Sequence, residues 1–428
     1  MISTQELYNK FTECSGVSTD TRKIVPGTMF FALKGDNFDG NKYASEALTA
    51  GANYAVVDDP EMVETEQYLL VDDVLISLQK LAKHHRNTMN IPVIGLTGSN
   101  GKTTTKELIG EVLATKFKVV ATAGNFNNHI GVPLTLLRMS NETEIVVVEM
   151  GANHMGEIAA LCNIAQPTHG LITNIGKAHL EGFGSYEGVV RAKSELYHYL
   201  IEHQGVVFVN SEDPVLKNMS KRITEPVFYN NQGDYYACNL ISANPYVEFE
   251  TEKGENVQTK LIGTYNFKNI AAALCVGKYF KVEPTVANQA IANYIPANNR
   301  SQIIHTNTNQ IILDAYNANP ISIKAALDNF EAMEHPNKIV ILGDMFELGV
   351  DTDIEHNHMV EQVEQMALCK SLFCGIASAK AAENHNTTAY FLTKEALTDY
   401  LKENPITDSL ILIKASRGMG LETLVEYL

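Results

Sequence analysis

The chain has 428 residues, a length typical of about three domains. Hydrophobic residues make up 45% of it and charged residues 19%, which excludes a disordered chain. The 33 Lys and Arg against 50 Asp and Glu give a formal net charge of −17, which excludes a binder of duplex nucleic acid, because such a protein needs a basic face.

The sequence also carries information on location. No segment approaches the roughly 20 apolar residues that a membrane-spanning helix needs, and the first residues show no secretory signal. The six cysteines contain no CxxC pair, a pattern typical of reduced thiols. We therefore predict a cytoplasmic protein with no membrane insertion, and we expect a monomer.

Residues 1–87 form the first predicted domain, a small α/β unit. Short β-like runs at 28–33, 54–57 and 68–71 alternate with turn residues. Apolar residues between 74 and 82 recur at helical spacing, which predicts an amphipathic helix at the end of this domain.

Residues 88–298 form the second predicted domain. Buried strands are expected at 91–97, 145–148, 170–173 and 206–209, with helical patterns between them. Strands that alternate with helices predict a parallel sheet covered on both faces. The turn-rich stretch 226–260 predicts a small β insertion.

Residues 299–428 form the third predicted domain. Its expected strands are 311–313, 338–342, 372–374, 390–392 and 410–413, with helical patterns between most of them. This alternation predicts a second, Rossmann-like α/β unit. The fold class is therefore α/β in three domains.

The strongest local motif is a glycine-rich stretch, residues 95–104, between a predicted strand and a predicted helix. Such a loop cradles phosphates with its backbone N–H groups and the helix N-terminus. Lys102 can reach the β and γ phosphates, and the Thr103 hydroxyl can bind Mg²⁺. A strict phosphate-loop pattern needs glycine where this chain has Leu96, so a turn with an accidental Gly-Lys-Thr is the alternative. The candidate loop residues are Gly98, Ser99, Asn100, Gly101, Lys102, Thr103 and Thr104.

Three further residues could complete such a site. Glu149 follows a predicted strand, where a carboxylate can hold Mg²⁺ or can cap the next turn. His179 follows another strand, where it is a metal ligand or a structural histidine. Lys193 lies in a helical pattern and, on its own, indicates a solvated lysine.

Several segments together resemble the Mur ligases and their folylpolyglutamate synthetase relatives. The resemblance rests on Glu149-Met-Gly, His179, Lys193 and the segments 97–104, 125–133 and 266–269. Other segments resemble the Mur ligases that act on D-alanyl-D-alanine, and they extend the likeness over the whole chain. These segments are 18–22, 26–35, 38–40, Asp-Ala-Tyr-Asn-Ala-Asn-Pro at 314–320, 343–349 and 414–418. Ala315 and Ala415 depart from the usual family residues but leave the main polar groups in place.

The resemblance implies an enzyme of peptidoglycan synthesis, an ATP-dependent ligase that adds D-alanyl-D-alanine to a UDP-N-acetylmuramoyl-tripeptide. ATP would convert the terminal carboxylate into an acyl phosphate, which the dipeptide amine then attacks. It also implies two Mg²⁺ ions, one held by Thr103 and Glu149 and one held by His179 and by Lys193 carbamylated with CO2. Lys102, Lys193, His179 and Glu149 would be the catalytic residues.

The resemblance also assigns binding roles by domain. The first domain would bind the UDP end, the second ATP, and the third the dipeptide while it closes over ATP. Candidate ATP-binding residues besides the loop are Asn266, Asn269, Arg300, Asp314 and Tyr316. Candidate substrate-binding residues are Asp20, Thr21, Arg22, Gly35, Asn125, Asn128, His129, Asn317, Asn319, Lys414 and Arg417. By position alone, 414–417 also fits a surface loop, and 317–320 also fits a helix start.

Other functions share parts of this pattern. Another Mur-type or a folylpolyglutamate-type amide ligase would use the same ATP loop with a different substrate. A nucleotide-binding regulator would use the loop without joining anything, but it would not need His179, Lys193 or the Tyr-Asn-Ala-Asn-Pro segment.

Overall fold

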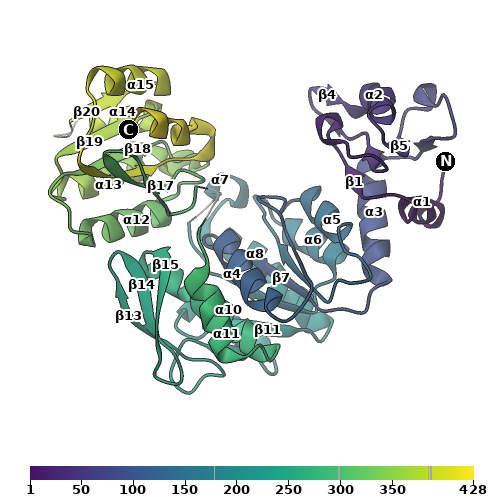
Figure 1. The fold of residues 1–428 in the computed structure, drawn as a ribbon, viewed down its shortest axis with the longest axis horizontal. Helices are drawn as coiled ribbons and strands as arrows, with labels where there is room; N and C mark the ends of the chain where they lie inside the picture. Colours follow the sequence, from purple (N-terminus) through teal and green to yellow (C-terminus); the bar gives the residue numbers. More distant parts are fainter. Residues whose placement is uncertain (178, 297–298, 384, 386–387) are drawn as a thin grey trace.

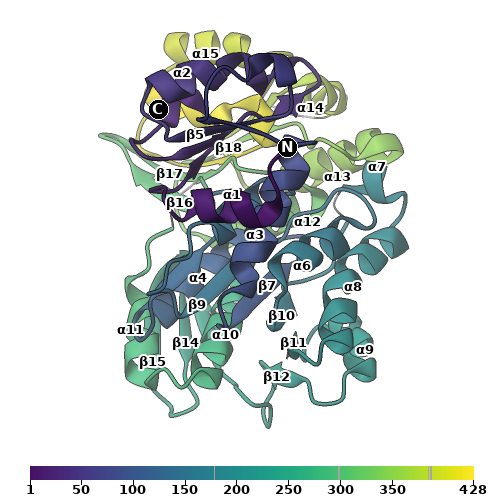
Figure 2. The ribbon, with the colours of Figure 1, turned by 90° about the vertical axis from the view of Figure 1, so that its right-hand side faces the viewer.

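The computed structural model describes residues 1–428 except 178, 297–298, 384 and 386–387. The described residues form three α/β units in chain order, which confirms the predicted fold class. The N-terminal and C-terminal units lie on opposite sides of Figure 1, and both views place them above the central unit (Figure 2). The expected boundary between the second and third domains, at 298, lies outside the described residues.

The N-terminal unit is built on a parallel sheet in the order β1-β2-β5-β6. Its strands are β1 (Val17–Ser18), β2 (Met29–Phe31), β5 (Tyr54–Val57) and β6 (Tyr68–Leu70), and the last three lie within the predicted runs. Helices α1 (Thr4–Phe11) and α2 (Ala44–Thr49) and the short pair β3 (Lys34–Gly35) and β4 (Phe38–Asp39) complete it.

Helix α3 (Val74–Asn87) joins the N-terminal unit to the central one. Asp73 caps it by accepting a hydrogen bond from the Ile76 N–H at 2.7 Å. At its other end the buried Arg86 guanidinium donates to the backbone oxygens of Ala165 and Gln166, where α6 (Glu157–Ala165) ends. The predicted amphipathic helix is thus a connector that is capped at its start and anchored to the central unit at its end.

The central unit is a parallel sheet in the order β12-β11-β10-β7-β9-β8. Helices α4 (Lys102–Ala114), α10 (Thr264–Tyr279) and α11 (Pro284–Asn293) pack on one face, and α5 (Gly131–Leu136), α6 and α8 (Tyr186–Glu202) pack on the other. Strand β7 lies inside the sheet, so the loop that follows it opens between the ends of β9 and β10. The strands are β7 (Val93–Thr97), β8 (Val119–Ala121), β9 (Ile145–Glu149), β10 (His169–Ile172), β11 (Val206–Asn210) and β12 (Val227–Tyr229).

The predicted β insertion is present but starts later than expected. Strands β13 (Asn239–Ala243), β14 (Tyr246–Glu250) and β15 (Asn256–Ile262) form an antiparallel sheet. Residues 227–229, which we assigned to the insertion, instead form β12 and pair in parallel with β11. The reason is apolar burial, because Tyr229 is 1% exposed and packs into the core of the central unit.

His169, at the start of β10, should make stability depend on pH. Its ring packs against Phe208, Tyr279 and Phe280, and burial lowers its pKa to about 4. In the unfolded chain the imidazole takes up a proton below about pH 6.5, whereas the folded protein does so only near pH 4. The stabilisation is therefore complete above pH 6.5 and is lost as the pH falls toward 4.

We expect the free energy of unfolding to fall by about 2 kcal/mol between pH 7 and pH 5 because of this one group. In His169→Phe, the free energy of unfolding measured with urea should therefore change less between pH 7 and pH 5, by about that amount. His198→Gln is the matched control, because the His198 side chain is 65% exposed and should leave the dependence unchanged. An equal change in the free energy of unfolding with pH for the parent and His169→Phe would contradict the role given to His169.

The C-terminal unit has the order β16-β17-β21-β18-β19-β20, parallel except for the edge strand β16. Helices α12 (Pro320–Ala332), α13 (Thr352–Glu364) and α14 (Ile376–Ala382) pack on one face and α15 (Lys394–Glu403) on the other. All five predicted strands are present, and the structure adds β16. The strands are β16 (Gln302–His305), β17 (Asn309–Asp314), β18 (Lys338–Gly343), β19 (Lys370–Cys374), β20 (Ala389–Phe391) and β21 (Ser409–Lys414). Within the described residues, no helix has the length and apolar character needed to cross a membrane.

Candidate functional site

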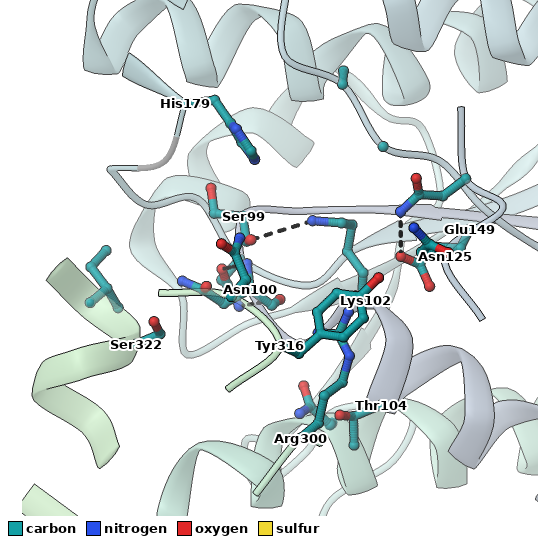
Figure 3. A pocket seen from close by; sticks show the side chains of 18 of the residues that line it. Ser99, Asn100, Lys102, Thr104, Asn125, Glu149, His179, Arg300, Tyr316 and Ser322 are labelled. Carbon is teal, nitrogen blue, oxygen red and sulfur yellow. Dashed lines mark hydrogen bonds between the residues drawn. The ribbon is translucent and has the colours of Figure 1, made fainter. Parts of the chain in front are cut away.

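A cavity of about 580 Å³ opens at the carboxyl end of β7 and β9, between the central and C-terminal units (Figure 3). Most of the predicted site residues of these two units line it. They are Ser99, Asn100, Gly101, Lys102, Thr104, Asn125, Asn128, His129, Glu149, His179, Asn266, Asn269, Arg300, Asp314, Tyr316, Asn317 and Lys414.

The glycine-rich loop is shaped by its glycines. Gly98 has φ +148°, and a Cβ there would lie 1.9 Å from the Thr173 hydroxyl oxygen. Gly101 has φ +76°, and a Cβ there would lie 2.7 Å from Asn269 Oδ1. Only glycine fits both the backbone and the space at these positions. Leu96, where a strict pattern has glycine, is buried within β7 and lies before the loop begins.

Lys102, the first residue of α4, lies back over the loop. Its Nζ donates to the backbone oxygen of Gly98 at 2.7 Å. It also donates to that of Ser99 at 3.3 Å (Figure 3). Burial lowers the pKa of Lys102 to about 8, against the opposing effect of the Glu149 charge. The N-terminus of the 13-residue helix α4 faces the same space, so cation and helix dipole together favour an anion here.

Glu149, at the end of β9, is 1% exposed. Its Oε1 accepts hydrogen bonds from the Thr103 hydroxyl at 3.2 Å and from Asn127 Nδ2 at 2.8 Å. Its Oε2 is buried and has no hydrogen-bond partner among the described residues. The glutamate therefore does not act as a turn cap. A buried carboxylate oxygen without a donor, beside a threonine hydroxyl, has the chemistry of a Mg²⁺ site.

Lys193 is buried, so the interpretation as a solvated lysine is wrong. It lies on α8 with 1% exposure, and its Nζ is 3.3 Å from the Ala152 backbone oxygen and 5.2 Å from the Phe183 ring centre. Burial, reinforced by the charge of Lys102, lowers the pKa of Lys193 to about 7. Its surroundings thus favour the neutral form of this amine.

His179 precedes the short helix α7 (Leu180–Phe183), with φ +52°. Its Nδ1 is hydrogen-bonded to Glu347, which lies after β18 in the C-terminal unit. Burial lowers the pKa of His179, while Glu347 acts in the opposite direction. His179 therefore lines the cavity and also contacts the neighbouring unit.

Asn266 and Asn269 lie on α10, beneath the loop. Asn269 Nδ2 donates to Asn266 Oδ1 at 2.9 Å, and Asn266 Nδ2 donates to the Ile262 oxygen at 2.8 Å. Asn269 Oδ1 accepts from the Thr105 hydroxyl of α4 at 3.1 Å. Asn269 thus ties α10 to α4 just after the phosphate loop, and both amides form part of the cavity wall.

Asp314 and Lys414 end the adjacent strands β17 and β21 and form a buried ion pair with an Oδ2–Nζ distance of 2.6 Å. Lys414 also donates to the Asn317 oxygen at 3.1 Å and is 1% exposed, so it lies in a strand and not in a surface loop. Arg417, in contrast, lies in the exposed segment that follows β21.

Tyr316 lies between two guanidinium groups at the edge of the cavity. That of Arg300 is 3.7 Å from the ring centre (Figure 3). Arg417 Nη1 donates to the Tyr316 hydroxyl oxygen at 3.2 Å. The ring therefore offers a flat face next to two cations, an arrangement suited to a phosphate-bearing aromatic ligand.

Asn319 is the N-cap of α12, which confirms the helix-start interpretation of 317–320. Its side chain accepts from the Ser322 N–H at 2.9 Å. Its Nδ2 also donates to Asn100 Oδ1 of the phosphate loop at 2.7 Å. One side chain thus caps a helix of the C-terminal unit and contacts the loop of the central unit.

Other predicted site residues are not among the described residues that line the cavity. Gly98, Thr103, Lys193, Asn319 and Arg417 contact residues that line it. The remaining four belong to the N-terminal unit. There Asp20 caps the 3-10 helix Thr21–Lys23 and accepts from Arg22 Nε at 2.8 Å and Nη2 at 2.9 Å, while Gly35 lies in β3.

Several residues that line the cavity carry no chemical signal in the sequence. Asn127, which orients Glu149, was not distinguishable from the neighbouring asparagines of 125–128. Others, both polar and apolar, come to the cavity only through the fold. They are Gly151, Ala152, Asn153, Glu157, Ala160, Leu161, Asn174, Tyr265, Ser301, Ile321, Ser322 and Ala325.

Comparison with known proteins finds ligases that are similar to this chain over most of its length. The UDP-N-acetylmuramoyl-tripeptide–D-alanyl-D-alanine ligase of Bacillus subtilis (strain 168) is 37% identical over 97% of this chain and 93% of its own length. The enzyme of that name from Escherichia coli (strain K12) is 33% identical over 99% and 95%. A crystal structure of MurF from Acinetobacter baumannii superposes with a TM-score of 0.86 at 29% identity, covering 99% of this chain and 98% of its own.

MurF from Thermotoga maritima, solved in complex with ADP, superposes with a TM-score of 0.83 at 27% identity, covering 98% of this chain and 97% of its own. Family models match along the chain in the expected order. The Mur ligase family catalytic domain matches residues 13–97, the Mur ligase middle domain 96–277, and the Mur ligase glutamate ligase domain 299–417. The chain therefore belongs to the Mur ligase family.

Proposed function

We propose that this chain uses ATP to join D-alanyl-D-alanine to the terminal carboxyl group of a UDP-N-acetylmuramoyl-tripeptide. The observation that carries the proposal is the cavity in which the Lys102 loop and Glu149 face Asp314 and Tyr316 of the C-terminal unit. Relatives that bear this enzyme's name match the chain over nearly its full length.

The reaction proceeds in two steps. A carboxylate oxygen of the tripeptide attacks the γ phosphorus of ATP, an acyl phosphate forms, and ADP leaves. The neutral amine of the dipeptide then attacks the acyl carbon, the C–N bond forms, and phosphate leaves while the amine loses a proton. The first step brings two anions together, so Lys102 and the loop N–H groups act by neutralising and positioning charge.

Mg²⁺ fits the residues around Glu149. The unpartnered Oε2 and the Thr103 hydroxyl would hold one ion, which supplies charge neutralisation at the phosphates. A second ion would be held by His179 and Lys193. For this, the neutral Lys193 Nζ bonds to the carbon of CO2 and releases one proton, which yields a carbamate oxygen as ligand. The lowered pKa of Lys193 supports this chemistry.

The binding roles follow the three units. Residues 1–87, with Asp20, Thr21, Arg22 and Gly35, bind the UDP end, and residues 88–298 bind ATP, with Asn266 and Asn269 beside the adenine. Residues 299–428 bind the dipeptide and close over ATP. Asn125, Asn128 and His129 face the reacting carboxylate. For the dipeptide carboxylate, Arg417 is a better partner than Lys414, because Lys414 is already paired with Asp314.

Phosphate release tests the proposal. The protein is incubated with ATP, Mg²⁺ and D-alanyl-D-alanine, with a UDP-tripeptide that carries either diaminopimelate or lysine as its third residue. We expect release that requires both the UDP-tripeptide and the dipeptide. Release with a folate plus glutamate instead would indicate the folylpolyglutamate-type reaction. ATP binding without release under any of these conditions would indicate a regulator and overturn the proposal.

A further inference from the structure

The segment 150–156 connects β9 to α6 and lies next to two of the candidate metal ligands. It begins directly after Glu149, the last residue of β9. Its Ala152 oxygen is 3.3 Å from Nζ of Lys193, which is buried on α8. The helices α6 and α8 pack against each other on one face of the central sheet (Figure 2). The position of this segment therefore affects where Lys193 lies relative to Glu149.

The same segment also contacts the helix that follows His179. A Cβ on Gly182 of α7 would lie 2.2 Å from the Asn153 oxygen, so the two backbones approach closely. The Glu157 carboxylate holds the turn between them and α6, because its Oε2 accepts a hydrogen bond from the Asn153 N–H at 2.7 Å. Three of the four candidate metal ligands are thus carried by elements that contact this one stretch of backbone.

Glu195, two residues beyond Lys193 on α8, fastens the end of this stretch to α8. Its Oε1 accepts a hydrogen bond from the Gly156 N–H at 2.7 Å, and its Oε2 accepts one from the Ala159 N–H at 2.9 Å. Gly156 is the N-cap of α6 and has no side chain with which to cap the helix. The first N–H groups of a helix need acceptors, and a carboxylate there also interacts favourably with the helix dipole. A side chain of α8 therefore caps α6.

Capping alone does not require a residue from another helix. Two other helices of the central unit take their caps from the residue directly before them, α8 from Ser185 and α9 (Pro214–Met219) from Asp213. The cap of α6 instead comes from Glu195, 39 positions beyond Gly156. A cap taken from another helix also fixes the two helices relative to each other, which a cap from the preceding residue does not do.

We propose that Glu195 is a positioning residue: by capping α6 from α8, it fixes the segment 150–156 and with it the distance of Lys193 from the other candidate metal ligands. The proposal rests on the proposed function. Glu195 is not among the described residues that line the cavity, and both of its carboxylate oxygens already accept N–H groups. It therefore acts through Lys193 and not on a substrate. Ligands held at fixed places need little rearrangement during the reaction.

Removal of the cap tests this role against a matched loss of stability. Glu195→Ala leaves two N–H groups of α6 without their acceptor. Asp213→Ala does the same to α9, where Asp213 accepts from the Val215 and Leu216 N–H groups at 2.9 and 3.1 Å. Both variants should lose thermal stability to a similar extent. Glu195→Ala should in addition lower kcat about 10-fold or more, since small misplacements of catalytic groups are costly, whereas Asp213→Ala should keep its kcat.

The kinetic constants separate positioning from nucleotide binding. The KM for ATP should change little in Glu195→Ala, because Glu195 bonds to α6 and not to the phosphate loop. The Mg²⁺ concentration that gives half of the maximal rate should rise, because the ligands no longer lie at a fixed separation. Glu195→Gln keeps the length of the side chain and one acceptor oxygen, so its kcat should lie between those of the parent and Glu195→Ala.

A second measurement does not depend on turnover. Parent protein equilibrated with isotopically labelled bicarbonate should give the NMR signal of a carbamate carbon, and Lys193→Met should lack it. We expect a weaker carbamate signal in Glu195→Ala, because Lys193 Nζ is no longer held against the Ala152 oxygen. Asp213→Ala should give the same signal as the parent.

These results separate the role of Glu195 from the proposed function. A parent that releases no phosphate would refute the function, and the carbamate signal would still test Glu195. Equal losses of kcat in Glu195→Ala and Asp213→Ala would show an effect of stability alone and would overturn the proposal. So would an unchanged kcat together with an unchanged carbamate signal in Glu195→Ala, once circular dichroism shows that both variants are folded.

Discussion

Lys193→Ala should lower the rate of ligation by about 10²- to 10³-fold, the loss that follows removal of one preorganised electrostatic group. Lys193 is buried within the wall of the central unit and has a lowered pKa, so it is suited to become a carbamate and not to remain an ammonium. The measurement is kcat with all substrates saturating. Full activity in Lys193→Ala would refute the role.

Chemical rescue sharpens this expectation. Removal of the side chain leaves a space that a short carboxylate such as formate or acetate can enter, and part of the lost activity should return. Lys193→Met is the matched control, because it fills the same space with an apolar chain and should not be rescued. Rescue of both variants would show that the added anion acts elsewhere. In parent enzyme freed of CO2, activity should fall and should return with bicarbonate.

Glu149→Gln should also lower kcat by about 10²- to 10³-fold. The replacement removes the charge that a divalent cation needs while it keeps the shape of the side chain and an oxygen that can accept from Thr103. In the absence of Mg²⁺, however, the variant should be at least as stable as the parent, since it no longer buries a carboxylate oxygen without a donor.

Thermal unfolding with ADP, with and without Mg²⁺, separates these two effects. The parent should gain stability when Mg²⁺ is added to the nucleotide, and Glu149→Gln should gain much less. Glu142→Gln, in the exposed turn before β9, is the control and should behave as the parent does. An equal Mg²⁺ response in the parent and Glu149→Gln would mean that the ion is held without this carboxylate.

Local motifs were predictable from the sequence because their function depends on neighbouring residues. The loop 98–104 combines glycines, a lysine and a threonine within one turn, and its strand-loop-helix context shows in hydrophobic periodicity alone. Glu149 was predictable because it ends a strand. The alternation of strands and helices was likewise enough for the α/β class.

Other parts of the site depend on strand order, which periodicity does not encode. Asp314 and Lys414 are 100 residues apart and meet only because β17 and β21 are neighbours in the sheet. The burial of Lys193 depends on which face of α8 packs inward, and a single lysine in a helix does not indicate this. The double role of Asn319 needs the docking of two units, so the sequence indicated a helix start and not the contact with Asn100.

The net charge of the whole chain differs in meaning from the charges placed in the cavity. A total of −17 opposes anionic ligands only mildly. Lys102, Arg300 and the N-terminus of α4 place positive charge in the cavity, whose lining also includes Glu149, Glu157 and Asp314. Composition therefore excluded nucleic acid but carried little information about a phosphorylated substrate.

The connecting helix α3 lies between the N-terminal unit and the central sheet and packs against both. Its 14 residues, at about 1.5 Å each, span about 21 Å, with the Asp73 cap at one end and the Arg86 contact with the central unit at the other. A substrate held at one end by the N-terminal unit must place its other end in the cavity.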